Sequence, residues 1–118
     1  MNKPRYSLRR NFGYALAGFA HVFRHETVFK IETAAFVVFS AVAWRLPVGR
    51  CEHLWLQVSL FLPLLAELFN SAVERTVDLA TQKEHPLAKA AKDSAAAGCL
   101  LAVVMTATVW GIVLMDLL

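Results

Sequence analysis

Polar side chains follow the second long apolar segment of this sequence at helical spacing. Residues 54–66 are almost entirely apolar, and the next residue is Glu67. Intervals of three and four place side chains on one face of an α-helix, with Glu67 and Glu74 roughly 10 Å apart along its axis. An ionisable group inside a membrane segment costs at least ~2.5 kcal/mol on insertion scales, so this face is a candidate functional site. The polar stripe comprises Glu67, Asn70, Ser71, Glu74 and Asp78.

A purely structural stripe is the alternative interpretation. Asp78 would then lie beyond the membrane, and Ser71 would bond only to its own backbone. Glu74 would be an interfacial charge paired with Arg75 or a neighbouring lysine. Glu67, however, has no basic residue three or four positions away on either side. The functional interpretation is therefore favoured.

The composition indicates a membrane protein with a single domain. Of 118 residues, 58% are hydrophobic, against ~45–50% apolar residues in soluble domains. Cys51 and Cys99 form no CxxC or Cys/His cluster, so the sequence supports neither a disulfide framework nor a zinc site. Neither GxxxxGK[ST] nor GxGxxG occurs, so side chains and metal must hold any bound phosphate. We expect no nucleic-acid partner.

Hydropathy and periodicity predict an all-α integral membrane fold within one domain, residues 1–118. The predicted elements are an amphipathic surface helix at about 7–25 and spans at about 28–46, 53–73 and 93–117. The first helix has an apolar face containing Phe12, Phe19 and Phe23, which suits the headgroup region of a bilayer. Packing as an ordinary bundle helix is the alternative. Pro63 is expected to kink the second span.

Basic residues predict the orientation in the membrane. Ten of the twelve Lys and Arg residues lie in residues 1–30 and 75–92. Short basic segments stay in the cytoplasm, so we expect a cytoplasmic N-terminus and a C-terminus outside, in the periplasm. Glu26, Glu74 and Lys92 would then lie at the cytoplasmic face.

Carboxylates from two segments could hold a metal at this face. Glu26 precedes the first span, and Glu74 belongs to the second. Mg²⁺ prefers oxygen ligands and is usually held by one or two carboxylates plus substrate phosphates. Lys92 could neutralise phosphate charge, unless Lys92-Asp93 is only a helix-start pair. His85 could contact a nucleotide or be a plain loop histidine.

Several motifs together resemble one known family. They are Glu67-x-x-Asn70-Ser71-Ala72-x-Glu74-x-x-Val77-Asp78, His85-Pro86-Leu87-Ala88-Lys89, Ala91-Lys92-Asp93, Gly13-Tyr14 and Phe23-Arg24-His25-Glu26-x-x-Phe29-Lys30-x-Glu32. On these residues, roughly 7 to 105, the chain resembles the prokaryotic diacylglycerol kinase family. The resemblance implies a homotrimeric lipid kinase of the bacterial inner membrane, with active sites shared between protomers, Mg²⁺ as cofactor and ATP as co-substrate.

The resemblance also implies a role for each matching residue. Catalytic roles fall to Glu67 as general base and to Asn70, Lys92 and Asp93, while Glu26 and Glu74 hold Mg²⁺. ATP would contact Tyr14, Glu26, Glu74, Lys83, Glu84, His85, Lys92 and Asp93. The lipid would contact Glu67, Phe23, Glu32 and Ala96.

Different motifs of the sequence favour different lipid substrates. The Phe-Arg-His-Glu segment favours diacylglycerol, whose phosphorylation at the primary hydroxyl gives phosphatidic acid. The His-Pro-Leu-Ala-Lys segment and Ala95-Ala96, which replace a Gly-Ser pair, favour undecaprenol. Ser7 occupies the place of a family arginine, which Arg9 or Arg10 would have to replace. A non-catalytic membrane protein, such as a holin-like pore or an accessory subunit, is the alternative from another class.

Overall fold

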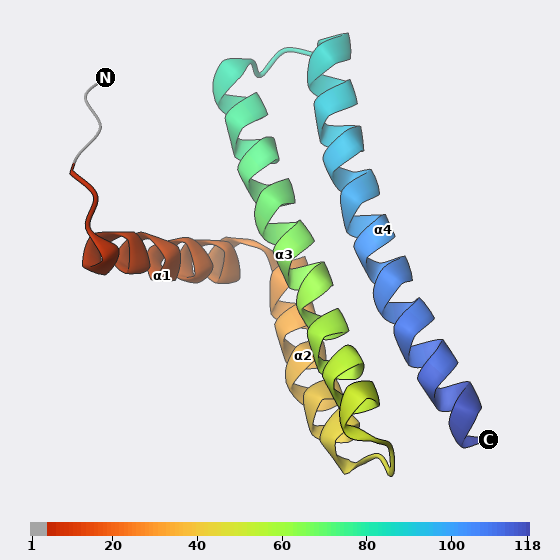
Figure 1. The fold of residues 1–118 in the computed structure, drawn as a ribbon. Coiled ribbons are helices and arrows are strands. Elements are labelled where there is room, and N and C mark those ends of the chain that lie inside the picture. Colours follow the sequence, from red (N-terminus) through yellow and green to blue (C-terminus); the bar gives the residue numbers. More distant parts are fainter. Residues whose placement is uncertain (1–4) are drawn as a thin grey trace.

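The computed structural model describes residues 5–118, which form four α-helices and no β-strand. The helices are α1 (Leu8–His25), α2 (Thr27–Arg45), α3 (Arg50–Ala80) and α4 (Pro86–Leu117) (Figure 1). In this part of the chain three helices, α2 to α4, are long and apolar enough to cross a membrane. The predicted all-helical fold, with three helices able to span a membrane, is therefore confirmed.

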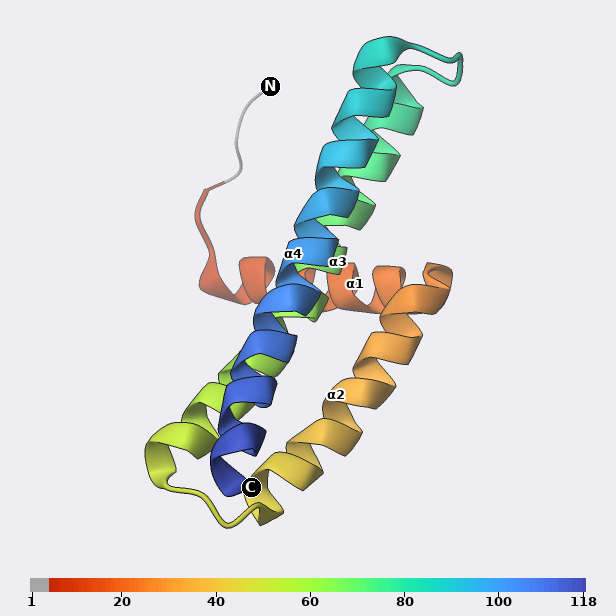
Figure 2. The ribbon, with the colours of Figure 1, turned by 90° about the vertical axis from the view of Figure 1, so that its right-hand side faces the viewer.

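The three long helices run beside one another, and α1 projects to the side (Figures 1 and 2). α3 packs against α4 most extensively, then against α2, and also contacts α1. The loop between α3 and α4 lies at the opposite end of the bundle from the loop between α2 and α3. α3 therefore links both ends of the bundle and contacts every other helix.

The apolar core lies toward the end that holds the α2–α3 loop. It consists of Ala43, Leu56, Leu60, Trp110 and Val113. Side-chain hydrogen bonds join α2 to α3 at this end. Trp44 Nε1 donates to Gln57 Oε1 (2.8 Å), and Gln57 Nε2 donates to Ser40 Oγ (3.0 Å). Most other large apolar side chains are exposed. Such an apolar exterior suits a protein surrounded by lipid.

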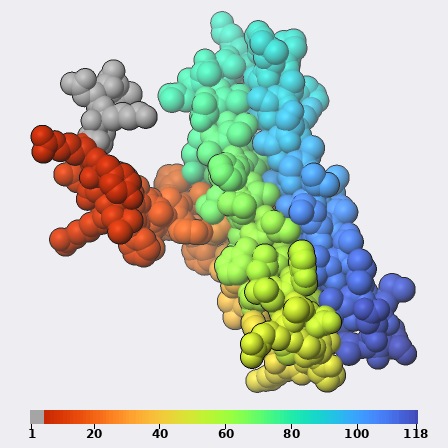
Figure 3. All heavy atoms as spheres, in the orientation of Figure 1, coloured from red at the N-terminus to blue at the C-terminus, as the bar shows by residue number. Residues whose placement is uncertain are grey.

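Helix α1 is compatible with the predicted surface helix. It begins after Ser7, whose side chain accepts a bond from Arg10 N (3.4 Å). Phe12, Phe19 and Phe23 are all exposed along it, and it stands apart from the three-helix body (Figure 3). Its position at a membrane surface stays a prediction.

Two helix boundaries differ from the predicted spans. α4 begins at Pro86 rather than near residue 93, because His85 caps the helix by accepting a bond from Leu87 N (3.1 Å). Proline suits the first turn, where its missing N–H is not needed. α3 continues to Ala80, beyond the predicted span end at 73, and remains one α-helix through Pro63. The extensions carry both helices beyond the apolar segments.

Candidate active site

The side chain of Asn70 connects two carboxylates on the buried face of α3. Its Nδ2 donates to Glu74 Oε1 (3.2 Å) and lies 3.5 Å from Glu67 Oε1. Glu67 and Asn70 are buried, and Glu74 is half-buried. The helical stripe predicted from spacing is thus a set of contacting side chains rather than a solvated face.

Glu26 reaches the same part of α3 from the corner between α1 and α2. Its Oε1 accepts a hydrogen bond from Ser71 Oγ (3.2 Å) and lies 3.6 Å from Arg75 Nη2. Ser71 is fully buried. The suggestion that Ser71 bonds only to its own backbone is therefore wrong, as is the pairing of Arg75 with Glu74.

A cysteine from α4 completes the surroundings of Glu67. Cys99 Sγ donates to Glu67 Oε2 at 3.5 Å, a weak hydrogen bond typical of a thiol. The two oxygens of Glu67 therefore face donors on two different helices, α3 and α4. Nothing in the sequence pattern indicated this role for Cys99.

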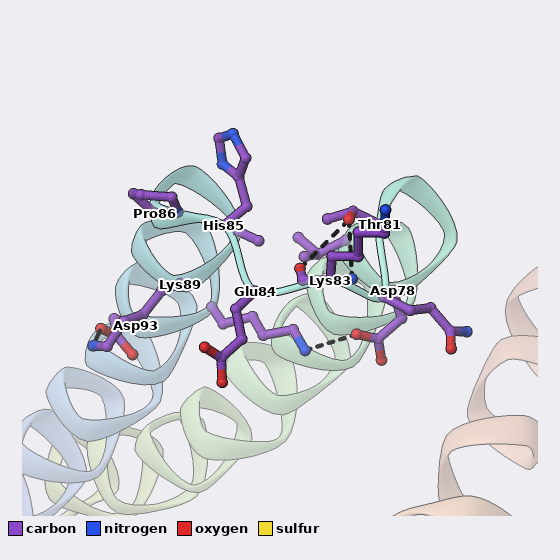
Figure 4. Close-up of a pocket in the computed structure, with 12 residues that line it drawn as sticks. Asp78, Thr81, Lys83, Glu84, His85, Pro86, Lys89 and Asp93 are labelled. Atoms are coloured by element: carbon purple, nitrogen blue, oxygen red, sulfur yellow. Dashed lines mark hydrogen bonds and ion pairs between the residues drawn. The ribbon is translucent and has the colours of Figure 1, made fainter.

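A second group of polar residues surrounds a cleft of about 830 Å³ at the α3–α4 loop (Figure 4). The predicted nucleotide residues Lys83, Glu84 and His85 line it together with Lys92 and Asp93. In Figure 4, Glu84 points between the two helices and the ring of His85 points away from them. Five of the predicted ATP-binding residues are thus brought together here.

Two ion pairs lie at this cleft, one between α3 and α4 and one within α4. Lys92 Nζ lies 2.7 Å from Asp78 Oδ1, which ties α4 to α3, and Asp93 pairs with Lys89. Lys92 and Asp93 lie in the second turn of α4, so the alternative of a helix-start pair is wrong. Asp78 lies one turn beyond Glu74, about 6 Å along the helix. The cleft therefore adjoins the carboxylate cluster, which comprises Glu26, Glu67 and Glu74 together with Asn70.

The structure does not bring every predicted residue to these two places. Tyr14, Phe23 and Ala96 are exposed and do not line the cleft. Glu32 lies in a separate apolar groove of about 390 Å³ between α2, α3 and α4. Its Oε2 is buried and, among residues 5–118, has no hydrogen-bond partner. Of the predicted lipid contacts, only Glu67 belongs to the carboxylate cluster.

The carboxylate cluster fits a magnesium ion that arrives with phosphates. Residues 5–118 contain no group of three or more His, Cys, Asp or Glu side chains able to enclose a metal ion. Mg²⁺, however, needs only one or two protein carboxylates when phosphates supply further ligands. Glu26 and Glu74 provide such oxygens, and Asn70 Oδ1 is a buried acceptor left without a partner in the described chain. The donor set is therefore of the right chemistry.

Comparison with known proteins identifies the family. The family model described as prokaryotic diacylglycerol kinase matches residues 13–114, most of the chain. The chain belongs to the prokaryotic diacylglycerol kinase family. The matched range contains the whole carboxylate cluster and the α3–α4 cleft. By family this protein is a lipid kinase of a bacterial membrane, and the resemblance noted from its motifs is confirmed.

The relatives of this chain carry one of two names, diacylglycerol kinase or undecaprenol kinase. The diacylglycerol kinase of Pseudomonas aeruginosa is 39% identical over 103 residues, covering 87% of this chain and 84% of the relative. That of Escherichia coli (strain K12) is 30% identical, covering 86% and 84%. The undecaprenol kinase of Bacillus subtilis is 67% identical, but over 39 residues, 32% of each chain.

Proposed function

We propose that this lipid kinase transfers the γ-phosphoryl group of ATP to the primary hydroxyl of diacylglycerol, giving phosphatidic acid. The observation that carries the proposal is the contact of Asn70 with Glu67 and Glu74, one helical turn from a cleft lined with Lys92. Glu26 is bonded to the next residue of the same helix, Ser71. An acceptor for a proton, two carboxylates able to hold a metal ion, and a cleft that contains lysine side chains are the parts that phosphoryl transfer requires.

Glu67 has the position and chemistry of the general base. Its carboxylate would accept the proton of the lipid hydroxyl as that oxygen bonds to phosphorus and ADP leaves. Asn70 and Cys99 donate to its two oxygens and so hold its orientation. Glu67 lies on the buried face of α3, a helix long and apolar enough to cross a membrane.

Glu26, Glu74 and the residues that line the α3–α4 cleft would bind the nucleotide. Glu26 and Glu74 would hold Mg²⁺, which would neutralise phosphate charge when bound. Lys83, Glu84, His85 and Asp93 line the cleft where the rest of ATP would lie. Lys92 would exchange its bond with Asp78 for one with a phosphate, and Tyr14 would contact ATP.

Changing either metal carboxylate tests this arrangement. Glu26→Gln and Glu74→Gln should each raise the Mg²⁺ concentration needed for half-maximal activity, because each removes an ionised oxygen ligand. The measurement is phosphate transfer at increasing Mg²⁺ with saturating ATP. Glu52→Gln, which removes an exposed carboxylate in the first turn of α3, is the matched control. Unaltered metal dependence in both variants would contradict the assignment.

We further propose a homotrimer in the inner membrane, with a cytoplasmic N-terminus and a C-terminus outside. The basic segments support this orientation, because residues 1–30 and 75–92 hold ten of the twelve Lys and Arg residues. Tyr14 and Ala96 lie outside the cluster and the cleft in a single chain. Active sites shared between protomers would allow such residues to act on a neighbouring copy's substrates.

Undecaprenol is the second candidate substrate, favoured by the short 67% match to an undecaprenol kinase. The full-length similarity to diacylglycerol kinases favours diacylglycerol instead. Apolar pockets discriminate by about 1–3 kcal/mol per methylene, so we expect activity on both lipids and a higher kcat/KM for diacylglycerol. Radiolabelled phosphate transfer to each lipid in the same detergent measures this ratio. A higher kcat/KM for undecaprenol would reverse the choice of lipid, and transfer to neither would contradict the proposed activity.

A further inference from the structure

Glu26 is held through only one of its two oxygens. Ser71 Oγ and Arg75 Nη2 both approach Oε1, at 3.2 and 3.6 Å. Within residues 5–118 no hydrogen bond reaches Oε2 of Glu26. Glu74 is held in a similar way, because Asn70 donates to its Oε1. Each carboxylate thus keeps an oxygen available for a further ligand.

Arg75 is the cation that forms an ion pair with Glu26. Its side chain is 39% exposed and that of Glu26 is 27% exposed, so the pair is only partly in contact with solvent. His21 lines the same hollow as Arg75, between α1 and α3. The pKa of His21 is lowered, first by desolvation and then by the charge of Arg75. Arg75 is the positive group that the structure pairs with Glu26.

Glu26 needs such a partner because of where it lies in the chain. It is the single residue between α1 and α2, and its side chain makes no capping bond to α2. Without contacts to α3 its rotamer would be free to vary, and a flexible carboxylate loses side-chain entropy when it binds a metal. Hydrogen-bond partners of ligating carboxylates orient them, and losing one typically costs 10–100-fold in metal affinity.

We propose that Arg75 is a positioning residue, which together with Ser71 holds Glu26 by Oε1 so that Oε2 faces the metal that accompanies ATP. This inference rests on the proposed metal role of Glu26. Arg75 itself touches neither metal nor substrate in this arrangement. The guanidinium contact joins two segments that are 49 positions apart, fixing the α1–α2 corner against α3.

Binding of Mn²⁺ tests the proposal without relying on turnover. The whole chain, purified in detergent with a non-hydrolysable ATP analogue, is titrated with Mn²⁺, and the free ion is measured by electron paramagnetic resonance. Arg75→Gln should weaken Mn²⁺ binding about 10-fold. Arg75→Lys, which keeps the charge, should retain more affinity than Arg75→Gln. Arg45→Gln, at the far end of α2, controls for loss of one arginine.

A double variant separates this inference from the proposed function. If Arg75 acts through Glu26, adding Arg75→Gln to Glu26→Gln should weaken binding little further, because the two residues act as one unit. Additive losses, or Arg75→Gln binding Mn²⁺ like Arg45→Gln, would overturn the positioning role. Unchanged binding in Glu26→Gln alone would instead overturn the metal assignment. Thermal unfolding of each variant reports a purely structural effect. In that case Arg75→Lys and Arg75→Gln would lower the unfolding midpoint to the same extent.

Discussion

Replacing Glu67 with glutamine is expected to abolish phosphoryl transfer while the protein still inserts and folds. Removing a positioned general base typically costs 10²–10⁴-fold in rate. The amide oxygen of glutamine can still accept the bond from Asn70 (3.5 Å in the wild type). An uncharged isostere also costs less in a membrane than a carboxylate. The substitution therefore removes the proton acceptor and the weak hydrogen bond from Cys99.

The measurement is kcat for lipid phosphorylation at saturating ATP, Mg²⁺ and lipid. Glu52→Gln is a suitable control, since that carboxylate is exposed at the opposite end of α3. Glu67→Gln should keep the thermal unfolding midpoint and particle size of the wild type. A variant with turnover comparable with that of Glu52→Gln would show that Glu67 is not the base.

Much of this site could be predicted from sequence because its central part is local. Glu67, Asn70 and Glu74 belong to one helix, and helical geometry alone places them on one face. Their mutual contacts through Asn70 follow from that spacing. The three long apolar helices were equally accessible to prediction, since hydropathy over a long window needs no tertiary information.

Contacts between distant segments could not be derived in the same way. Ser71 donates to Glu26, 45 positions away, and Cys99 to Glu67, 32 positions away. No periodicity encodes such pairs, which depend on how α1 and α4 pack against α3. The alternative that pairs Arg75 with Glu74 conflicts with helical geometry, because adjacent helical residues do not face each other. Arg75 instead faces the α1–α2 corner.

The start of α4 illustrates a local signal that hydropathy overlooks. The apolar pattern begins near residue 93, whereas the helix begins at Pro86. His85 and Pro86 form a cap and a first turn that polar residues can occupy without membrane burial. This extension matters for function, because it places Lys92 beside Asp78 on α3.

Replacing Asn70 with alanine is expected to lower kcat by about 10²-fold, because one amide orients two functional carboxylates. A misplacement of reacting groups by about 1 Å can cost that much. In the wild type, Asn70 Nδ2 donates to Glu74 Oε1 (3.2 Å) and lies 3.5 Å from Glu67 Oε1. Without it, the buried carboxylate of Glu67 and the half-buried carboxylate of Glu74 lose a common donor that fixes their orientation.

The matched control for Asn70→Ala is Thr76→Ala on the same helix, where the hydroxyl bonds only to the backbone oxygen of Ala72 (2.7 Å) and is exposed. Because Asn70 contacts both the proposed base and a proposed metal ligand, its loss should reduce kcat and also raise the Mg²⁺ requirement. Glu67→Gln should reduce kcat without changing the Mg²⁺ requirement. Steady-state rates across a Mg²⁺ titration distinguish the two patterns. An Asn70→Ala variant with the kcat and metal dependence of Thr76→Ala would contradict the bridging role and leave the two carboxylates to act independently.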